Sequence, residues 1–551
     1  MKSKFILASL LVSFLNINAQ QSPVFKLVKD INPSGDSLPS DLIKVDSKIY
    51  FVADDGVHGR ELWVTEGTET KLVKDIYPGE SGSEIYNLRN LNGKLIFTAT
   101  DEANGNELWI SDGTESGTKL LKDMYPGSAS SYAFEFVEFK NALYFRSEDG
   151  VHGTELWKTD GTTDGTVMVT DLRAGEFGSN PAYMTVLNDK LYFNAVDGFD
   201  TENGEHGFEL WATDGTSAGT YMVKDISAEN GSYPSDLKAF GNKVYFNADD
   251  GTNGIELWAT DGTNAGTYMV KNINTGGNGN SIPGDFIDFN GKLLFSAYSS
   301  ETGREMWTTD GTETGTKILK DVYEGTENGV IPQFKYIIYN NKLYLTLKDA
   351  DHGGEIWSTD GTAEGTQLFM DVFPGPGDSM GVTISPMLFQ VMGGKLYFRA
   401  VNSDEFYQLW QSDGTLAGTK KIMADPENPS EDALGYTPYF TAMGDKLYFT
   451  AKYNDSGYEL WTVTADDAMA VADVHKNKFS VYPNPADDFV TISGDDVITS
   501  VQIYDYSGKL LLTNSANSKK LQLNVSSLSK GNYVVKVVSE NKSSSYKIIK
   551  K

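Results

Sequence analysis

The sequence lacks several residue types and patterns that would point to common classes of protein. It has no cysteine, so neither disulfide bonds nor thiolate metal sites contribute to its stability. No apolar run approaches the roughly 20 residues that a membrane-spanning helix needs. We find no phosphate-binding loop, zinc motif, nucleophile elbow or paired-carboxylate signature. The sequence therefore gives no direct indication of a catalytic centre.

Basic residues are outnumbered, with 46 Lys and Arg against 76 Asp and Glu, a net charge of -30. The charge is uneven: the segment from His475 onward carries +5, and the remainder carries -35. An acidic body repels nucleic acid and anionic membrane surfaces, so we expect neither as a partner. The acidity favours solubility. Calcium is the only cofactor that it suggests.

The first residues have the pattern of a secretory signal peptide. Lys2 and Lys4 precede the apolar stretch 5–15, and Ala19 offers a small residue before a cleavage site. We predict cleavage between Ala19 and Gln20. Residues 1–19 are then a signal peptide, and the mature chain is exported.

A repeat extends through most of the chain, and its clearest copy is the stretch from Glu209 to Thr216, Glu-Leu-Trp-Ala-Thr-Asp-Gly-Thr. All nine tryptophans occupy one position of this repeat, at intervals of 46 to 54 residues. They are Trp63, Trp109, Trp157, Trp211, Trp258, Trp307, Trp357, Trp410 and Trp461. A period of this length is typical of solenoids, propellers and arrays.

Each repeat unit predicts four short strands, which in the first unit are 41–45, 48–53, 61–65 and 70–76. β-branched and aromatic residues fill these runs, and Asn-Gly turns such as Asn92-Gly93 separate the first two strands. The strands are apolar on both faces, as expected where each sheet is covered on both sides by neighbours. We predict an all-β fold with a large β-propeller of about nine four-stranded blades over residues 20–465.

The two ends of the repeat region predict how the ring closes. Residues 27–31 repeat the fourth-strand sequence of residues 72–76, although no first strand precedes them. The last unit loses its Asp-Gly-Thr turn after its third strand. We therefore expect the N-terminal strand to complete the last blade. Because nine blades exceed the usual range of roughly four to eight, an eight-bladed ring with an irregular unit and an open array remain alternatives.

The repeat ends before a linker at 466–477 and a C-terminal segment at 478–551. This segment contains short alternating runs separated by turn residues, which predicts a small β-sandwich of immunoglobulin-like size.

Two resemblances follow from these residues. The repeat is similar to the ELWxxDGT repeat family, which has no established biochemistry, so this resemblance implies no activity. Residues 478–551 resemble the type A C-terminal sorting domain of the type IX secretion system of Bacteroidota. The motif residues are Tyr482, Pro483, Asn484, Pro485, Gly531, Lys550 and Lys551. The resemblance implies the type IX secretion machinery as a partner and export through the periplasm to the outer-membrane surface or the medium.

Two sets of repeated polar residues could have a structural or a functional role. The turn aspartates could ligate cations, but every hairpin needs Asp-Gly for its tight turn, so we favour a structural role. They are Asp112, Asp160, Asp214, Asp261, Asp310, Asp360 and Asp413. His58, His152, His206 and His352 share another position, where other units have residues such as Asn104 or Asn253. This substitution indicates a polar loop residue before a glycine with positive φ.

Propeller topology predicts where a ligand would bind. The loops between strands two and three and the connections from strand four to the next blade lie at the same end. These loops are irregular, acidic and aromatic, and we expect any ligand there. Asp54, Asp55, Asp249 and Asp250 are our candidates for calcium binding.

We favour a non-enzymatic binding or adhesion module for an extracellular polysaccharide or protein. A hydrolase or lyase acting on polysaccharide is the alternative, and a purely structural adhesion component is a third possibility.

Overall fold

A computed structural model describes residues 23–199, 204–228, 231–275, 279–331, 334–377, 389–401, 407–424, 433–435, 438–454, 456–464, 479–483, 485–504, 510–539 and 542–551. The chain divides into two compact units, Met1–Asp466 and Asp467–Lys551. The predicted signal peptide with Ala19 and Gln20, and the sorting-motif residue Asn484, lie outside the described residues. Within the described parts, no helix is long and apolar enough to cross a membrane.

The first unit contains nine four-stranded antiparallel sheets among its described residues, and we call these sheets blades 1 to 9. Blades 1 to 3 comprise β2 (Ser40–Val45), β3 (Lys48–Asp54), β4 (Arg60–Thr65), β5 (Thr70–Lys74), β6 (Tyr86–Leu91), β7 (Lys94–Asp101), β8 (Gly105–Ser111), β9 (Lys119–Lys122), β10 (Phe134–Phe139), β11 (Ala142–Glu148), β12 (Thr154–Thr159) and β13 (Val167–Thr170). Blades 4 to 6 comprise β14 (Ala182–Leu187), β15 (Lys190–Val196), β16 (Phe208–Thr213), β17 (Tyr221–Lys224), β18 (Ser235–Phe240), β19 (Lys243–Asp249), β20 (Ile255–Thr260), β21 (Tyr268–Lys271), β22 (Gly284–Phe289), β23 (Lys292–Ser299), β24 (Gly303–Thr309) and β25 (Lys317–Lys320). Blades 7 to 9 comprise β26 (Tyr336–Tyr339), β27 (Lys342–Asp349), β28 (Gly353–Thr359), β29 (Gln367–Met370), β30 (Phe389–Met392), β31 (Lys395–Val401), β32 (Tyr407–Ser412), β33 (Lys420–Ile422), β34 (Thr441–Met443), β35 (Lys446–Lys452), β36 (Tyr458–Thr464) and β1 (Val24–Lys29).

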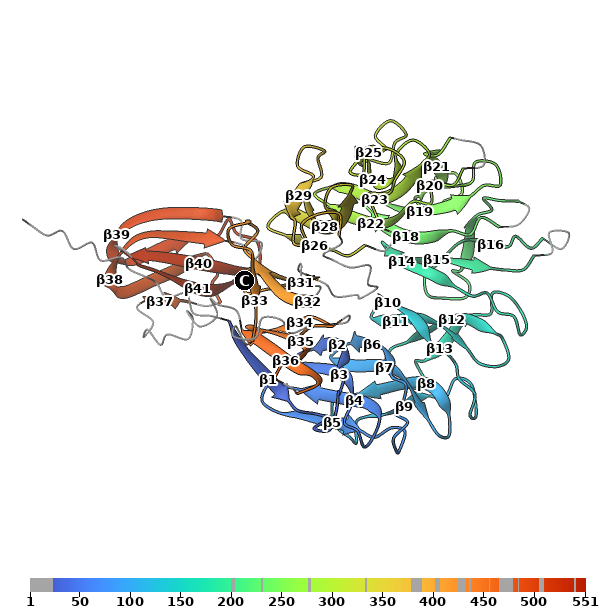
Figure 1. The fold of residues 1–551 in the computed structure, drawn as a ribbon, viewed down its shortest axis with the longest axis horizontal. Helices are drawn as coiled ribbons and strands as arrows, with labels where there is room; N and C mark the ends of the chain where they lie inside the picture. Colours follow the sequence, from blue (N-terminus) through green and yellow to red (C-terminus); the bar gives the residue numbers. More distant parts are fainter. Residues whose placement is uncertain are drawn as a thin grey trace, which may run out of the picture. The chain divides into compact units, whose positions relative to one another are not determined.

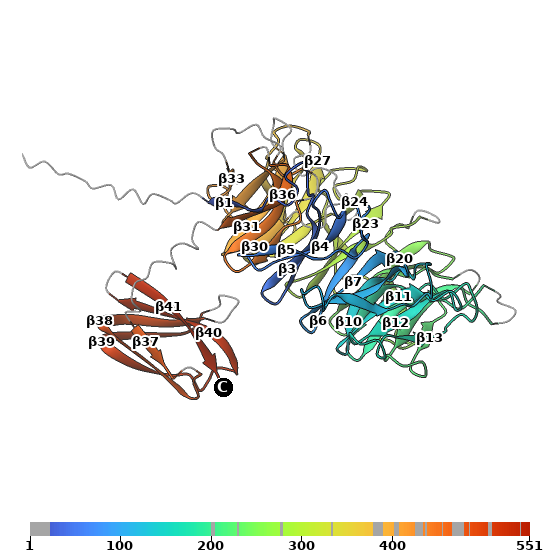
Figure 2. The same ribbon diagram turned by 90° about the horizontal axis from the view of Figure 1, so that it is seen from below.

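The blades form a propeller, with the first strands toward the middle of the ring and the fourth strands outside (Figure 1). The central strands are buried on both faces, as the unbroken apolar runs predict. In β3, for example, Tyr50, Phe51, Val52 and Ala53 are all buried. Figure 2 shows the same ring from below.

The repeated tryptophans pack between blades. Trp109 of blade 2 belongs to a hydrophobic cluster with Val45 and Val64 of blade 1, and Trp63 packs with Tyr448 and Leu460 of blade 9. Eight such clusters among the described residues each span two neighbouring blades. Burying one indole ring removes roughly 200 Å² from water, so these contacts are a large part of the cohesion of the ring.

The ring closes through the N-terminal strand, which confirms the predicted closure. β1 pairs antiparallel with β36, with Leu27 opposite Trp461 and Val24 opposite Thr464. β2 also lies beside β34, so blade 1 meets blade 9 at the centre of the ring. The structure thus has nine blades in a closed ring, and the eight-bladed ring and the open array are wrong.

The second unit is a small all-β domain. Its strands are β37 (Phe479–Tyr482), β38 (Phe489–Tyr504), β39 (Leu510–Asn524), β40 (Gly531–Ser539) and β41 (Lys542–Lys550). They form one five-stranded sheet, because the long β38 pairs with β37 through its first half, with β40 through its second half, and with β39 through both. The side chains of one face, including Val490, Ile503 and Val535, form the core.

We expect deletion of residues 23–30 to open the ring. Loss of β1 leaves β36 as an unpaired edge and uncovers apolar surface at the junction of blades 9 and 1. Thermal unfolding should show a fall in Tm of several degrees. The matched control is a chain that begins at residue 23 and therefore keeps β1. An unchanged Tm after deletion of residues 23–30 would contradict ring closure by β1.

Candidate functional site

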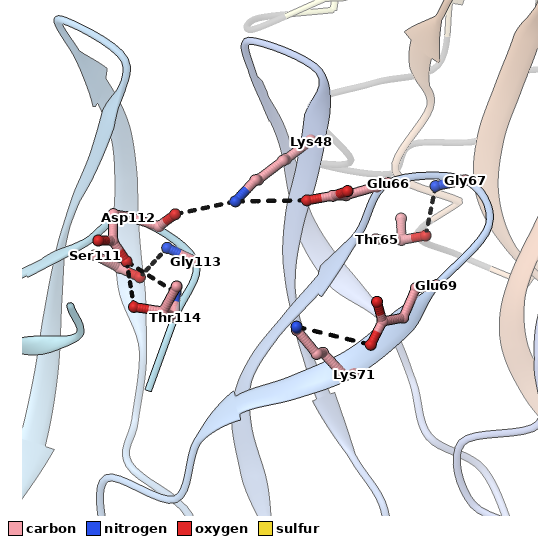
Figure 3. A network of polar contacts seen from close by, with 10 residues as sticks. All are labelled: Lys48, Thr65, Glu66, Gly67, Glu69, Lys71, Ser111, Asp112, Gly113 and Thr114. Atoms are coloured by element: carbon pink, nitrogen blue, oxygen red, sulfur yellow. Dashed lines mark hydrogen bonds and ion pairs between the residues drawn. The ribbon is translucent and has the colours of Figure 1, made fainter. Parts of the chain in front are cut away.

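The two ends of the propeller differ in chemistry, and one of them consists of repeated, internally bonded turns. We call this the turn end; it holds the hairpins between strands one and two and between strands three and four. Asp112 Oδ1 accepts hydrogen bonds from the N–H and O–H of Thr114 at 2.9 and 2.7 Å (Figure 3). These bonds lower the pKa of Asp112. Thr114 Oγ1 in turn accepts from the Gly117 N–H at 3.0 Å.

The same set of bonds recurs in six further turns, so the structural role that we favoured for the turn aspartates accounts for their repetition. The aspartates are Asp160, Asp214, Asp261, Asp310, Asp360 and Asp413. Lysines link these turns to the neighbouring blade. Lys48 Nζ of blade 1 donates to the Asp112 carbonyl of blade 2 at 3.1 Å and lies 3.5 Å from Glu66 Oε1 (Figure 3).

At the opposite end, each of the four repeated histidines bonds to a nearby aspartate in its own loop. His58 Nδ1 lies 2.8 Å from Asp55 Oδ2, and this hydrogen bond raises the pKa of His58. Blade 5 has Asn253 in the same place, and its Nδ2 donates to Asp250 Oδ2 at 2.8 Å. Because an asparagine makes the same bond, the histidines support the loop, as their replacement in the sequence indicated.

The four aspartates that we predicted as calcium candidates lie in two separate loops. Asp54 ends β3 and Asp55 follows it in blade 1, whereas Asp249 ends β19 and Asp250 follows it in blade 5. Asp54 accepts from the Gly56 N–H at 2.7 Å, and Asp249 accepts from the Gly251 N–H at 2.8 Å. No group of three or more His, Asp or Glu that could hold a metal ion occurs among the described residues. Calcium binding therefore stays a prediction.

We use the name connector for the segment from the fourth strand of one blade to the first strand of the next. In eight of the nine described blades, a buried glutamate near the start of the third strand holds the connector. Glu107 Oε2 accepts from the Met124 N–H at 2.9 Å, and its Oε1 accepts from the Tyr125 and Ser131 N–H groups. Equivalent bonds are made by Glu61, Glu155, Glu209, Glu256, Glu305, Glu355 and Glu459, all fully buried. Burial raises the pKa of Glu107 to about 7, against the opposing effect of these hydrogen bonds.

The glutamates position the residues that face solvent at this end, which we call the connector end. In six connectors a buried serine bonds to the glutamate or to its strand, and the next residue has positive φ. These pairs are Ser37-Leu38, Ser83-Glu84, Ser131-Tyr132, Ser179-Asn180, Ser232-Tyr233 and Ser281-Ile282. The geometry is fixed because both N–H groups of Ser232-Tyr233 donate to one carbonyl, that of Phe208. The following side chain is left to point outward.

A pocket of about 540 Å³ lies at the connector end between blades 2 and 3. It is lined by Glu84, Tyr86, Asn87, Thr98, Asn106, Ser130, Tyr132, Ala133 and Phe134. Tyr86 and Tyr132 are 57% and 64% exposed. The amide nitrogens of Asn87 and Asn106 donate to the carbonyls of Ala133 and Glu84, which orients both side-chain amides.

Further exposed aromatic rings lie at the connector end of blades 3 to 5. The Arg173 guanidinium lies 5.2 Å from the ring centroid of Phe177 and 5.7 Å from that of Phe199. Phe208 contacts both Phe199 and Tyr233. We call the six exposed rings of blades 2 to 5 the aromatic rim; they are Tyr86, Tyr132, Phe177, Tyr183, Phe199 and Tyr233.

Sequence reasoning missed a pair of aspartates near the centre of the ring. Asp236 and Asp285 occupy the same position in β18 and β22, and burial together with Asp285 raises the pKa of Asp236. Asn247 Nδ2 donates to Asp236 Oδ2 at 3.3 Å, and Ser296 Oγ donates to Asp285 Oδ2 at 2.8 Å. Arg304 donates to Ser296 Oγ at 2.9 Å. An aspartate at matching places in adjacent repeat units was the available signal.

In the second unit the structure brings several sorting-motif residues together. Gly531 is opposite Lys550 in the pairing of β40 with β41. The N–H of Lys551 donates to the carbonyl of Ala486, directly after Pro485, at 2.9 Å. Ala486 and the basic end of the unit therefore lie side by side, and Tyr482 is at the end of β37.

Residues 480–551 match the model of the secretion system C-terminal sorting domain. This match confirms the expected sorting domain and indicates a protein that is exported to the cell surface or secreted by way of the type IX machinery. No curated protein shows a sequence match to the chain.

Several solved structures are similar to this chain. PorZ, a surface component of the type IX secretion system of Porphyromonas gingivalis, is 14% identical over 93% of this chain and 75% of its own, with a TM-score of 0.30. The β-propeller domain of the Trilobed protease of Pyrococcus furiosus is 10% identical over 60% of this chain and 95% of its own, with a TM-score of 0.32. A prolyl endopeptidase is 11% identical over 69% of this chain, with a TM-score of 0.37, and this chain spans 55% of its length.

The buried glutamates predict a stability that falls as the pH rises. Burial raises the pKa of Glu209 from 4.5 to about 7, so the folded protein retains a proton that the unfolded chain releases between these values. The associated stability is complete below pH 4.5 and is lost as the pH rises through 7. We expect the difference in Tm, that of Glu209→Gln minus that of the unmodified protein, to increase as the pH rises from 5 to 8.

Blade 8 supplies the natural precedent for this variant, since Gln408 occupies the glutamate position and is buried there. Gln408→Glu is the matched converse and should introduce additional pH dependence. A Tm difference that stays constant with pH in Glu209→Gln would contradict the raised pKa.

Proposed function

We propose that this protein is an exported, non-enzymatic binding module that takes an extracellular polysaccharide or protein at the connector end of its propeller. The observation that carries the proposal is the difference between the two ends. The turn end is occupied by hydrogen bonds among its own repeated residues. The connector end has the pocket between blades 2 and 3 and large exposed aromatic side chains. Exposed aromatic groups that are not used in packing mark interaction surfaces.

The sorting domain agrees with this proposal, because a binding module on the cell surface meets extracellular polymers and proteins. The predicted signal peptide with cleavage between Ala19 and Gln20 would provide the first export step, into the periplasm. The same proposal includes membership of the ELWxxDGT repeat family and an origin in Bacteroidota. The occurrence of the repeat and the sorting domain in one chain supports both.

A polysaccharide hydrolase is the second candidate, and the Asp236 and Asp285 pair is the observation that favours it. Burial and the neighbouring carboxylate raise the pKa of Asp236, whereas Asp285 accepts a hydrogen bond from Ser296. Two neighbouring carboxyl groups, one of them with a raised pKa, can serve as acid and base. If the protein is a hydrolase, Asp236→Asn will abolish the release of reducing ends while leaving the Tm close to that of the unmodified protein.

A panel of extracellular polysaccharides in native gels, with and without calcium, tests the proposed function. We expect the purified protein to be retarded by at least one polymer and to leave that polymer intact, with no new reducing ends. If retardation needs calcium, Asp54→Asn and Asp249→Asn should show whether the predicted loops supply the site.

Two outcomes would contradict the binding proposal. Shortening of a polymer by the unmodified protein but not by Asp236→Asn would replace it with the hydrolase. Absence of retardation by every polymer, together with failure to pull down any cell-surface protein, would favour a purely structural adhesion component.

A further inference from the structure

The pocket between blades 2 and 3 has an arrangement of groups that identifies a class of ligand. Tyr86 and Tyr132 lie on two adjacent blades and expose their rings to solvent at its edge. Its lining combines polar residues, Asn87, Thr98 and Asn106 among them, with the apolar residues Ala133 and Phe134. No basic side chain is among the described residues that line it. Exposed rings beside fixed polar groups suit a ligand with apolar C–H faces and many hydroxyl groups.

The polar groups of the pocket are fixed by bonds to the protein and present acceptors to a ligand. Asn87 Nδ2 donates to the Ala133 carbonyl at 3.1 Å, and Asn106 Nδ2 donates to Thr100 Oγ1 at 3.1 Å. With both amide nitrogens engaged, the side-chain oxygens of Asn87 and Asn106 are the groups left for a ligand. Carbonyl oxygens and the Glu84 carboxylate accept hydrogen bonds from hydroxyl groups.

Tyr132 has an unfavourable backbone conformation, and the packing of its side chain does not offset the free energy that this conformation costs. Its φ is 47°, a region that glycine adopts readily and other residues rarely. The ring is 64% exposed, so little burial compensates for the unfavourable backbone conformation. Tyr233 has the same position, with φ of 48°, at the far side of the aromatic rim. Because Leu38, Glu84, Asn180 and Ile282 share this conformation, it belongs to the connector scaffold, and the side chain that it presents is what distinguishes Tyr132.

The charge of the molecule decides between classes of polysaccharide. The part of the chain before His475 carries -35, and Glu84 adds a carboxylate at the pocket itself. Two arginines lie against aromatic rings in this region: Arg173 over Phe177 and Phe199, and Arg146 over Phe134. They leave the net charge of this part of the chain strongly negative. A polymer of uronic acids or sulfated sugars would meet repulsion along its length. An uncharged polymer would not meet this repulsion.

We propose that the pocket lined by Tyr86, Asn87, Asn106 and Tyr132 binds an uncharged polysaccharide, whose sugar rings stack on the two tyrosines. The aromatic rim continues the binding path for further sugars across blades 3 to 5. This inference rests on the proposed binding function and names its ligand class and site. Because the attraction is not ionic, binding is expected to be insensitive to salt.

The test uses the full chain with uncharged polymers (laminarin, galactomannan, xyloglucan and amylopectin) and anionic polymers (alginate, polygalacturonate and carrageenan). Affinity is measured by gel retardation and calorimetry at 20 and 500 mM NaCl. We expect at least one uncharged polymer to bind with the same affinity at both salt concentrations, and the anionic polymers not to bind.

Variants of Tyr132 separate the loss of a binding ring from a loss of folding. Tyr132→Gly removes the ring and also relieves the backbone strain, so the Tm should be unchanged or higher while affinity falls at least tenfold. Tyr132→Phe keeps the stacking surface and should retain most of the affinity. Leu416→Ala, at an exposed apolar residue of the turn end, is the control and should bind normally.

Three results would overturn the inference. Each of them can be distinguished from a result that contradicts the proposed binding function. Binding of anionic polymers alone would refute the ligand class but retain a binding module. Normal affinity in Tyr132→Gly and in Tyr86→Ala would refute the site. Absence of binding to every polymer, with capture of a cell-surface protein, would leave a binding module whose ligand is not a polysaccharide.

Discussion

The structure depends on one repeated contact, between a buried glutamate at the start of a third strand and the backbone of the following connector. Eight of the nine blades have this glutamate, and Gln408 takes its place in the other. The contact satisfies amide groups that would otherwise be buried without partners, and it fixes where each first strand begins. Tryptophan packing then holds neighbouring blades together, but the glutamate determines how the chain passes between them.

The same contact also positions residues of the proposed binding site. Glu107 accepts from the Ser131 N–H, and the residue after Ser131 is the exposed Tyr132 of the pocket. Because the serine is anchored, the next side chain is directed to solvent whatever its type. The propeller can therefore keep one scaffold while the exposed residue varies from Leu38 to Glu84, Tyr132, Asn180, Tyr233 and Ile282. Variation at this position would change the proposed binding surface without altering the core.

The fold could be predicted from the sequence because its signals are local and repeated. For the candidate site, the sequence predicted only the end of the propeller and not the residues. Nine equally placed tryptophans predicted nine blades, and the duplicated sequence at residues 27–31 predicted the closure that β1 makes with β36. Tyr132 looked like any residue of a variable connector, since its exposure follows from the serine and glutamate bonds of the folded chain. Asp236 and Asp285 are 49 positions apart and become neighbours only through the ring.

Amide hydrogen exchange in Glu107→Ala tests the role of the buried glutamate most directly. If the Glu107 carboxyl group holds the connector, Met124 and Tyr125 will lose protection. Exchange at Ser131, whose N–H also donates to the Asn106 carbonyl, will increase to a lesser extent. Amides of the Asp112 turn, at the other end of the same blade, will stay protected. Unchanged protection at Met124 and Tyr125 would contradict the account, because the connector would then be held by contacts other than the glutamate.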